Sequence, residues 1–402
     1  MRDRSPLAVI FAVVTLDLIG FGVIIPLLPL YAKEFGANGT LVTLLFASYS
    51  LMQFIFAPMW GRLSDRIGRR PVLLVSIAGN VIALIGFGLA RSYVWLLLAR
   101  LAAGAFTANI SVANAYVADV TTPENRAKGM GMVGAAFGIG FVIGPFVGGE
   151  LGVFGFGVPA FAAAALGALN LLAAWRFLPE SLAPERRRRH SGESLRARFL
   201  AARTIDGLGL LLALAFLQVF AFSMLEVIFV LFGSVRLGFD ARAAGRVFAY
   251  IGVVMVIIQG GGIGPAVRRY GERRLVLGGL ALLAIGLGFL PLTPPGGWGM
   301  LLAMTTLVSV GQGLLSPSLT SLLSRRTPRD RQGAVLGLAH SLTALARVLG
   351  PPIAGVTYDL VGVGAPFWVA AAVMTLAFVA AAAWLDTSSP DAVVSVPVSG
   401  VP

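Results

Sequence analysis

Long apolar runs recur along the whole chain, and they constrain its fold more than any other feature. About twelve of them occur, each roughly 19–28 residues long, which is enough for a helix to cross a hydrocarbon core about 30 Å thick. Hydrophobic residues make up 57% of the chain and charged residues only 12%, far from the balance of a soluble domain. Because barrel strands would be shorter and would alternate, the sequence predicts an all-α integral membrane protein. The predicted spans are 8–31, 41–60, 71–91, 93–118, 126–151, 156–178, 208–234, 243–266, 274–292, 298–322, 331–358 and 364–385.

Two sets of six runs flank a polar, arginine-rich segment at 179–207. Short motifs recur on the two sides: Thr122-Pro123 is echoed by Thr327-Pro328, and Gly144-Pro145 by Gly350-Pro351. A nearly constant offset indicates internal duplication, so we predict two pseudo-symmetric halves. The predicted divisions are an N-terminal six-helix half at 1–178, a basic cytoplasmic linker at 179–207, a C-terminal six-helix half at 208–385, and a disordered tail at 386–402 that is rich in Ser, Pro and Val.

Arginines gather on alternate connections between the runs. The loop at 61–70 contains four of them and the central segment contains seven. This asymmetry follows the positive-inside rule, and it predicts a multi-pass protein of the cell (inner or plasma) membrane with both termini in the cytoplasm. The net charge of +13 could also suggest a nucleic-acid partner, but charge confined to one side of a bilayer argues against one. Loops on the other side contain little more than Lys33, Arg91, Arg236 and Arg242.

Composition also narrows the chemistry available to the chain. Cysteine is absent, and only two histidines occur, His190 and His340. Thiolate chemistry, disulfides and a metal cluster are therefore not expected, and neither is an enzyme or a cofactor. We expect the first run to be a span rather than a cleavable signal peptide, because it is long and includes Asp17, Pro26 and Pro29.

The loop at 61–70 is short and dense in charge. Its glycines permit a tight reversal, while charged groups at helix ends can pair with opposite charges or helix dipoles across the interface between the halves. We predict that it is a cytoplasmic gate, with Asp119 as the nearest partner of Arg70; charge that only sets topology is the alternative. The predicted gate residues are Gly61, Asp65, Arg66, Gly68, Arg69, Arg70 and Asp119.

A degraded copy of this loop follows at 264–274. It places Arg268 where Asp65 would be and Glu272 where Arg69 would be. The two loops are therefore not expected to be equivalent, and we expect the first to matter more.

Glycines recur every four residues in the fifth run. Gly140, Gly144, Gly148 and Gly152 share one face, which predicts a groove for close packing of another helix. Pro145 lies among them and permits a bend. The alternatives are a mobile seam along a transport path and ordinary small-residue packing. The motif comprises Gly140, Gly144, Pro145, Gly148 and Gly149.

Four charged residues lie more than one helical turn from either end of a predicted span: Asp17, Arg100, Glu226 and Arg347. Such groups are costly in hydrocarbon and normally face a polar cavity or a partner. Desolvation favours the neutral form of a carboxyl group, so Asp17 and Glu226 are candidate proton carriers or cation-attracting groups. The arginines would supply fixed charges that respond to them. Structural ion pairs, Asp17 with Arg100 and Glu226 with Arg347, are the alternative.

Polar and aromatic residues in the spans could complete a central cavity for amphipathic, often cationic molecules. Packing against lipid or protein is the alternative for each of them. The candidates are Gln53, Asn109, Asn114, Gln218, Gln259, Gln312, Phe220, Phe222 and Phe229.

Four motifs together resemble those of the major facilitator superfamily. Residues 61–73 resemble its signature loop between helices two and three, and residues 16–29 the first-helix motif of its drug:proton antiporter branch. Residues 100–104 and 138–149 resemble the fourth-helix and fifth-helix antiporter motifs. The chain is thus similar to twelve-helix drug:proton antiporters near the tetracycline-resistance and multidrug efflux transporters.

The resemblance implies a secondary transporter that works as a monomer and exports small molecules in exchange for protons by alternating access. It departs from the tetracycline exporters, which have an acidic residue in the ninth helix and a histidine in the eighth. Here 274–292 contains no acid and 243–266 no histidine, which puts tetracycline specificity and that proton route in doubt. Uptake or uniport of a sugar, organic acid or lipid-like metabolite is a second hypothesis, and a non-transporting receptor or scaffold is a third.

Overall fold

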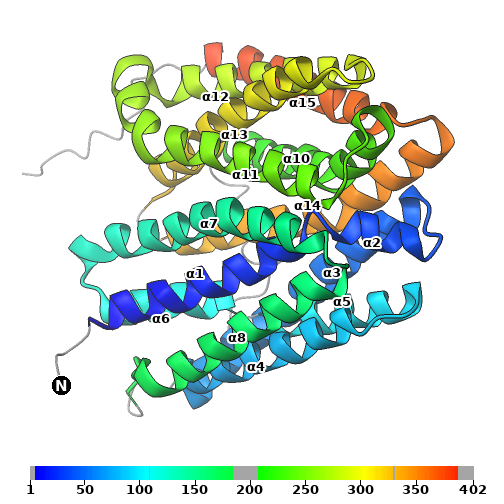
Figure 1. Cartoon of the computed structure of the whole chain (residues 1–402). Coiled ribbons are helices and arrows are strands. Elements are labelled where there is room, and N and C mark those ends of the chain that lie inside the picture. Colours follow the sequence, from blue (N-terminus) through cyan, green and yellow to red (C-terminus); the bar gives the residue numbers. More distant parts are fainter. Residues whose placement is uncertain (1–4, 108, 184–206, 329–330, 388–402) are drawn as a thin grey trace, which may run out of the picture.

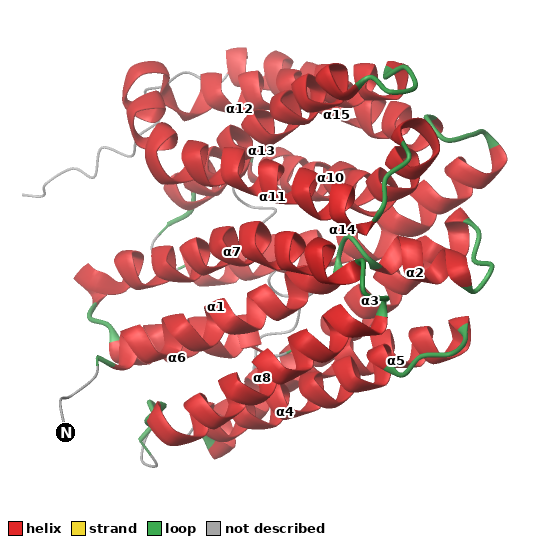
Figure 2. Cartoon of the chain, in the orientation of Figure 1, coloured by secondary structure: helices red, strands yellow, loops and turns green. Residues whose placement is uncertain are grey.

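The computed structural model describes residues 5–107, 109–183, 207–328 and 331–387. All regular structure in these ranges is helical, and they contain no strand (Figure 2). The all-α membrane fold is therefore confirmed. Most of the predicted linker and of the predicted tail lies outside the described residues.

The helices follow the predicted apolar runs closely. Up to the central segment they are α1 (Pro6–Ile24), α2 (Leu28–Glu34), α3 (Gly39–Ile67), α4 (Arg69–Gly88), α5 (Tyr93–Phe106), α6 (Asn109–Val120), α7 (Pro123–Gly152) and α8 (Gly157–Phe177). After it come α10 (Leu208–Leu237), α11 (Ala241–Ile257), the π-helix η2 (Ile258–Gly262), α12 (Ile263–Phe289), the short 3-10 helix η3 (Leu290–Leu292), α13 (Trp298–Arg326), α14 (Gln332–Leu360) and α15 (Ala365–Thr387).

Ten helical segments of the described chain are long and apolar enough to cross a membrane. One of them, Ala241–Leu292, has 52 residues and contains a non-helical residue at Gly271. The predicted number of twelve spans therefore stays a prediction, although the multi-pass character is clear.

Two predicted spans are interrupted. The first divides into α1 and α2 around Pro26, where a ring without an amide hydrogen disfavours a continuous helix. The fourth ends α5 at Phe106, and Thr107 has a non-helical ψ of 76°. No proline explains this second break.

Helices from the two sides of the central segment meet along two seams. α7 packs against α1 and α11, while α3 packs against α5 and α14. Figure 1 shows α1 to α8 in the lower part of the molecule and α10 to α13 in the upper part. This arrangement agrees with two halves, whose boundaries remain those predicted from sequence.

The outer surface is rich in exposed apolar side chains. Ile82 is 70% exposed, Leu169 63% and Leu376 69%. A soluble monomer rarely leaves so many large apolar groups in water, whereas a lipid-facing surface requires them.

Candidate functional site

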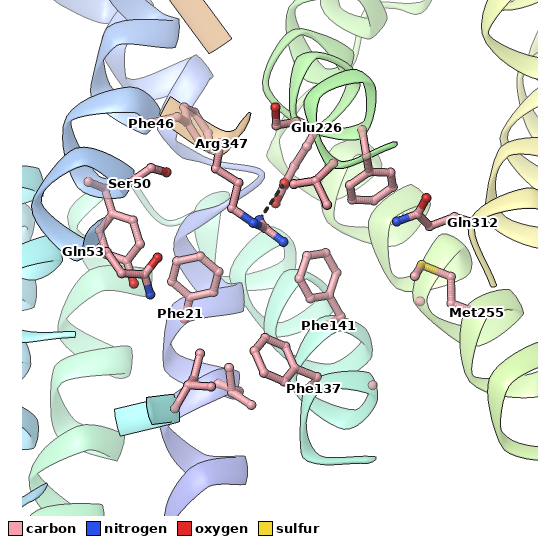
Figure 3. A pocket seen from close by; sticks show the side chains of 18 of the residues that line it. Phe21, Phe46, Ser50, Gln53, Phe137, Phe141, Glu226, Met255, Gln312 and Arg347 are labelled. Carbon is pink, nitrogen blue, oxygen red and sulfur yellow. Dashed lines mark ion pairs between the residues drawn. The ribbon is translucent and has the colours of Figure 1, made fainter. Parts of the chain in front are cut away.

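A cavity of about 380 Å³ lies between the helices that precede the central segment and those that follow it (Figure 3). α1, α3, α5 and α7 line one side, and α10, α11, α13 and α14 line the other. Its volume is in the range of small-molecule sites, roughly 300–1,000 Å³. The four charged residues that the sequence places deep in the spans all line this cavity: Asp17, Arg100, Glu226 and Arg347.

Glu226 of α10 faces Arg347 of α14 across one wall (Figure 3). Glu226 is 8% exposed, and its Oε2 lies 3.9 Å from Arg347 Nη1. The two groups are close enough to form an ion pair but too far apart for a hydrogen bond. The arginine side chain keeps 47% of its surface exposed to the cavity space. The pair is therefore loose enough for a proton or a ligand to compete for the carboxylate.

Arg100 of α5 is buried against aromatic rings of α3. Its guanidinium carbon lies 4.4 Å from the ring centre of Tyr49 and 5.7 Å from that of Phe46. Its Nε donates to the Leu45 carbonyl at 3.4 Å. The Thr107 hydroxyl, at the break after α5, lies 2.9 Å from the Tyr49 hydroxyl. These contacts hold a positive charge in one place at the cavity wall.

Asp17 of α1 is half-buried and precedes Phe21 by one helical turn. The ring of Phe21 lies 5.4 Å from that of Tyr49, so the wall with Asp17 adjoins the wall with Arg100. The cavity thus contains two carboxylates and two guanidinium groups, divided equally between the two sets of helices.

Aromatic and amide side chains fill the rest of the lining. The predicted residues Gln53, Gln259, Gln312 and Phe222 line the cavity, whereas Asn114, Gln218, Phe220 and Phe229 are not among the described residues that do. Gln312 is 7% exposed, and its Oε1 has no hydrogen-bond partner among the described atoms. The side chain of Asn109 lies outside the described part.

Several aromatic lining residues were not predicted from the sequence. Phe137 and Phe141 of α7 are four residues apart, and so are the lining glycines Gly134 and Gly138. A β-carbon at Gly134 would meet nothing within 4 Å, so its absence widens the cavity. This spacing next to the glycine motif was the available signal. The remaining missed aromatics are Phe21, Phe46 and Tyr49.

The segment predicted as a loop at 61–70 is largely helical: residues 61–67 end α3, Gly68 joins the two helices, and Arg69 begins α4. Arg69 is buried, and the guanidinium lies 2.6 Å from Asp65 of α3 and 3.1 Å from Asp119 of α6. The prediction that Asp119 pairs with Arg70 was therefore wrong. Neighbouring helix residues differ by about 100° in direction, so only one of the two arginines turns toward α6.

Glu180, just after α8, binds the start of α4. Its carboxylate accepts from the backbone N–H groups of Arg69 at 2.9 Å and Arg70 at 3.2 Å. Arg70 Nη2 donates to the Trp175 carbonyl at 2.6 Å. These contacts join helices that all precede the central segment, not the two halves as the sequence suggested. Of the other predicted gate residues, Gly61 is half-buried and Arg66 is exposed.

The copy of this motif has a similar glycine turn, but the charge is inverted at the positions of Asp65 and Arg69. Gly68 has a φ of 111° and Gly271, its repeat position, a φ of 73°, a region that favours glycine. Glu272, at the repeat position of Arg69, pairs with Arg325 of α13 at 2.9 Å. Arg325 is 70% exposed, so this pair is more solvated than that of Arg69.

The glycine face of α7 receives α1. A β-carbon at Gly144 would lie 2.7 Å from the Gly22 Cα, and one at Gly140 would lie 2.7 Å from the Leu18 Cβ. A β-carbon at Gly148 would clash with the Val23 carbonyl. Any side chain at these positions would push the helices apart.

A second face of α7 meets α11. A β-carbon at Gly149 would lie 2.9 Å from the Gly245 Cα and 2.7 Å from the Ala241 carbonyl. The carbonyl of Pro145 contacts Gly245. The fifth-run motif therefore forms part of a seam between the two sets of helices.

A family profile described as Major Facilitator Superfamily matches residues 10–264 and 262–401. The class C tetracycline resistance protein of Escherichia coli is 36% identical over 89% of this chain and 91% of its own length. Multidrug resistance protein 2 of Bacillus subtilis is 30% identical over 92% of each.

The crystal structure of the human organic anion transporter MFSD10 (TETRAN) superposes with a TM-score of 0.72 at 28% identity, covering 95% of this chain and 100% of that one. The chain therefore belongs to the Major Facilitator Superfamily and is a multi-pass membrane transporter rather than an enzyme.

Proposed function

We propose that this transporter exports amphipathic, often cationic small molecules in exchange for protons, by alternating access to its central cavity. The observation that carries the proposal is the meeting of two carboxylates and two guanidinium groups in one aromatic-lined cavity between two sets of helices. The tetracycline and multidrug resistance proteins among its relatives support export as the direction.

Charge balance in the cavity gives a reason for coupling. With Asp17, Glu226, Arg100 and Arg347 all ionised, the charges sum to zero, and protonation of either carboxylate leaves one net positive charge. A cationic substrate is then repelled and loses its counter-charge. Proton and substrate therefore compete for the same carboxylates, which is the requirement for exchange.

Glu226 is the better placed carrier of the two carboxylates. It is buried, and its loose pair with Arg347 leaves the carboxylate free to take a proton or a ligand cation. Tyr49 and Phe46 fix Arg100, so its positive charge stays at the cavity wall whether or not a substrate is bound. Asp17 adds a second carboxylate on the opposite wall.

The loop at 61–70 is proposed to shape the cytoplasmic gate indirectly. Its buried Arg69 ties the ends of α3, α4 and α6 into one unit. Such a unit moves as a rigid body when the halves rock. We further propose that the protein works as a monomer in the cell membrane, with both termini in the cytoplasm and without a cofactor or nucleic acid.

Everted membrane vesicles test this function. With an acid interior, we expect them to accumulate the cationic dye ethidium, and a protonophore should abolish the accumulation. Glu226→Gln and Asp17→Asn should each lower the proton-driven rate at least about tenfold, because a neutral amide cannot carry the proton.

Asp240→Asn is the matched control, because Asp240 caps its own helix α11 far from the cavity lining, and asparagine caps equally well. Proton-coupled export would be refuted if the rate of dye movement did not depend on the proton gradient, or if it were unchanged in both cavity variants.

A further inference from the structure

We propose that two carboxylates, Asp359 and Glu150, are paired latches that hold the outer end of the transporter closed. The outer end is the one at which α3 and α11 begin, opposite the loop at 61–70, and the arginine distribution predicts that it faces outside. The inference rests on alternating access as proposed above, but it concerns residues outside the cavity.

The first latch joins α14 to the start of α3. Asp359 Oδ1 accepts from the Gly39 N–H at 2.9 Å, and its Oδ2 accepts from the Thr40 N–H at 2.8 Å and from the Thr40 hydroxyl at 2.7 Å. The first amides of a helix have no partner within the helix and carry its positive dipole end, so a carboxylate there is stabilising. Asn38, the cap from within α3, satisfies a different amide, that of Leu41. Asp359 thus completes a helix cap from the other set of helices.

The second latch joins α7 to the start of α11. Glu150 Oε2 lies 2.9 Å from Arg242 Nε, and its Oε1 lies 2.8 Å from Arg246 Nε. The two arginines are four residues apart on one face of α11, so one carboxylate engages both.

The two latches occupy equivalent places in the internal repeat. Thr40 and Arg242 are 202 residues apart, close to the offset between the repeated motifs. In each latch an acid near the carboxyl end of one helix holds the amino end of a helix from the other set. The partners differ, since backbone amides hold Asp359 and guanidinium groups hold Glu150.

Tight packing accompanies each latch. A β-carbon at Gly355 would lie 2.7 Å from the Thr40 Cα, and one at Gly149 would lie 2.9 Å from the Gly245 Cα. Further inward, a β-carbon at Gly252 would lie 3.0 Å from the Phe141 carbonyl, where the cavity lining begins. The seams therefore separate the cavity from the outer end, and the latches fasten them. Figure 1 shows α2, α3 and α14 together at this end of the molecule.

Opening toward the outside must break both latches. Asp359 is exposed and the Glu150 side chain is 29% exposed. Water can therefore replace the lost partners, and breaking either latch should cost little free energy. Removing the charge of one acid should shift the population toward the open form by a few-fold, and removing both should multiply the two effects.

Accessibility of a single cysteine measures this shift directly. The chain contains no cysteine, so Ser50→Cys on the cavity wall is the sole thiol. In intact cells, a membrane-impermeant maleimide reaches this thiol only when the outer end opens. We expect Asp359→Asn and Glu150→Gln each to raise the labelling rate about threefold, and the double variant about tenfold. Full labelling after denaturation should be equal for all variants, which controls for expression.

Asp240→Asn is again the control, because Asp240 Oδ1 accepts only from the nearby Ala243 N–H of α11 in the described contacts. Unchanged labelling in the double variant, or an equal rise in Asp240→Asn, would overturn the latches. The assay needs neither substrate nor gradient. If labelling rises as predicted but no dye is exported, the proposed function is overturned and the latches stand. If dye is exported but labelling is unchanged, the latches are overturned and the proposed function stands.

Discussion

Replacing Arg69 with alanine should destabilise the transporter far more than replacing Arg325, although each arginine forms the ion pair at one of the two repeated motifs. Arg69 is 8% exposed and holds two carboxylates, those of Asp65 and Asp119. Removing one partner of a buried ion pair costs about 3–5 kcal/mol. The carboxylates left behind are 32% and 22% exposed, so water recovers part of this cost. We therefore expect a loss of about 2–3 kcal/mol.

Arg325→Ala is the matched comparison. Arg325 is 70% exposed in its pair with Glu272, and exposed pairs contribute about 0.2–1 kcal/mol. The Ser321 hydroxyl, 3.1 Å from Glu272 Oε1, remains as a partner. The loss of stability should thus be at least about 1 kcal/mol larger for Arg69→Ala than for Arg325→Ala.

Thermal unfolding in detergent, followed by the fraction that elutes as a monodisperse species after heating, measures both variants. We expect an apparent melting temperature several degrees lower for Arg69→Ala and nearly unchanged for Arg325→Ala. Arg69→Lys should lie between, because an ammonium cannot hold two carboxylates in fixed directions. Equal losses for the two alanine variants would refute the reasoning from burial.

Two further pairs of substitutions test the packing and the cavity wall. Gly144→Val should abolish accumulation of folded protein in the membrane, because its β-carbon would lie 2.7 Å from the Gly22 Cα, whereas a β-carbon in Gly134→Ala meets nothing within 4 Å and should be tolerated. The yield of membrane protein distinguishes the two variants, and equal yields would contradict close packing of α1 on α7. Tyr49→Leu should lower the apparent affinity for ethidium about threefold to tenfold, because it releases Arg100. Tyr49→Phe keeps the ring and should lower the affinity less. Equal effects of the two variants in a dye-binding titration would argue against the cation–π contact.

The sequence could place charged residues in the cavity because hydrocarbon leaves few options for them. Asp17 and Glu226 had to face protein or water, and both line the same space. The break after α1 was likewise foreseeable from Pro26, but the break at Thr107 was not, since threonine is compatible with a helix. The spacing of Phe137 and Phe141 was not sufficient to assign them to the cavity, because phenylalanine at helical spacing suits a lipid face as well as a cavity.

Some pairings over long distances could not be predicted from the sequence. Choosing between Arg69 and Arg70 as the partner of Asp119 requires the rotation of α4 to within one residue, which apolar runs do not define. Asp359 and Gly39 are 320 residues apart, and neither belongs to a repeated motif. Such contacts depend on how the two sets of helices pack, and that is a property of the whole fold.

Proton release on substrate binding tests the central claim most directly. In weakly buffered detergent solution near neutral pH, ethidium binding to the parent protein should release up to about one proton per bound molecule, because cation and proton compete for Glu226 and Asp17. The double variant Glu226→Gln with Asp17→Asn should release none. Binding to the parent without proton release at any pH between about 5 and 8 would contradict competition for these carboxylates.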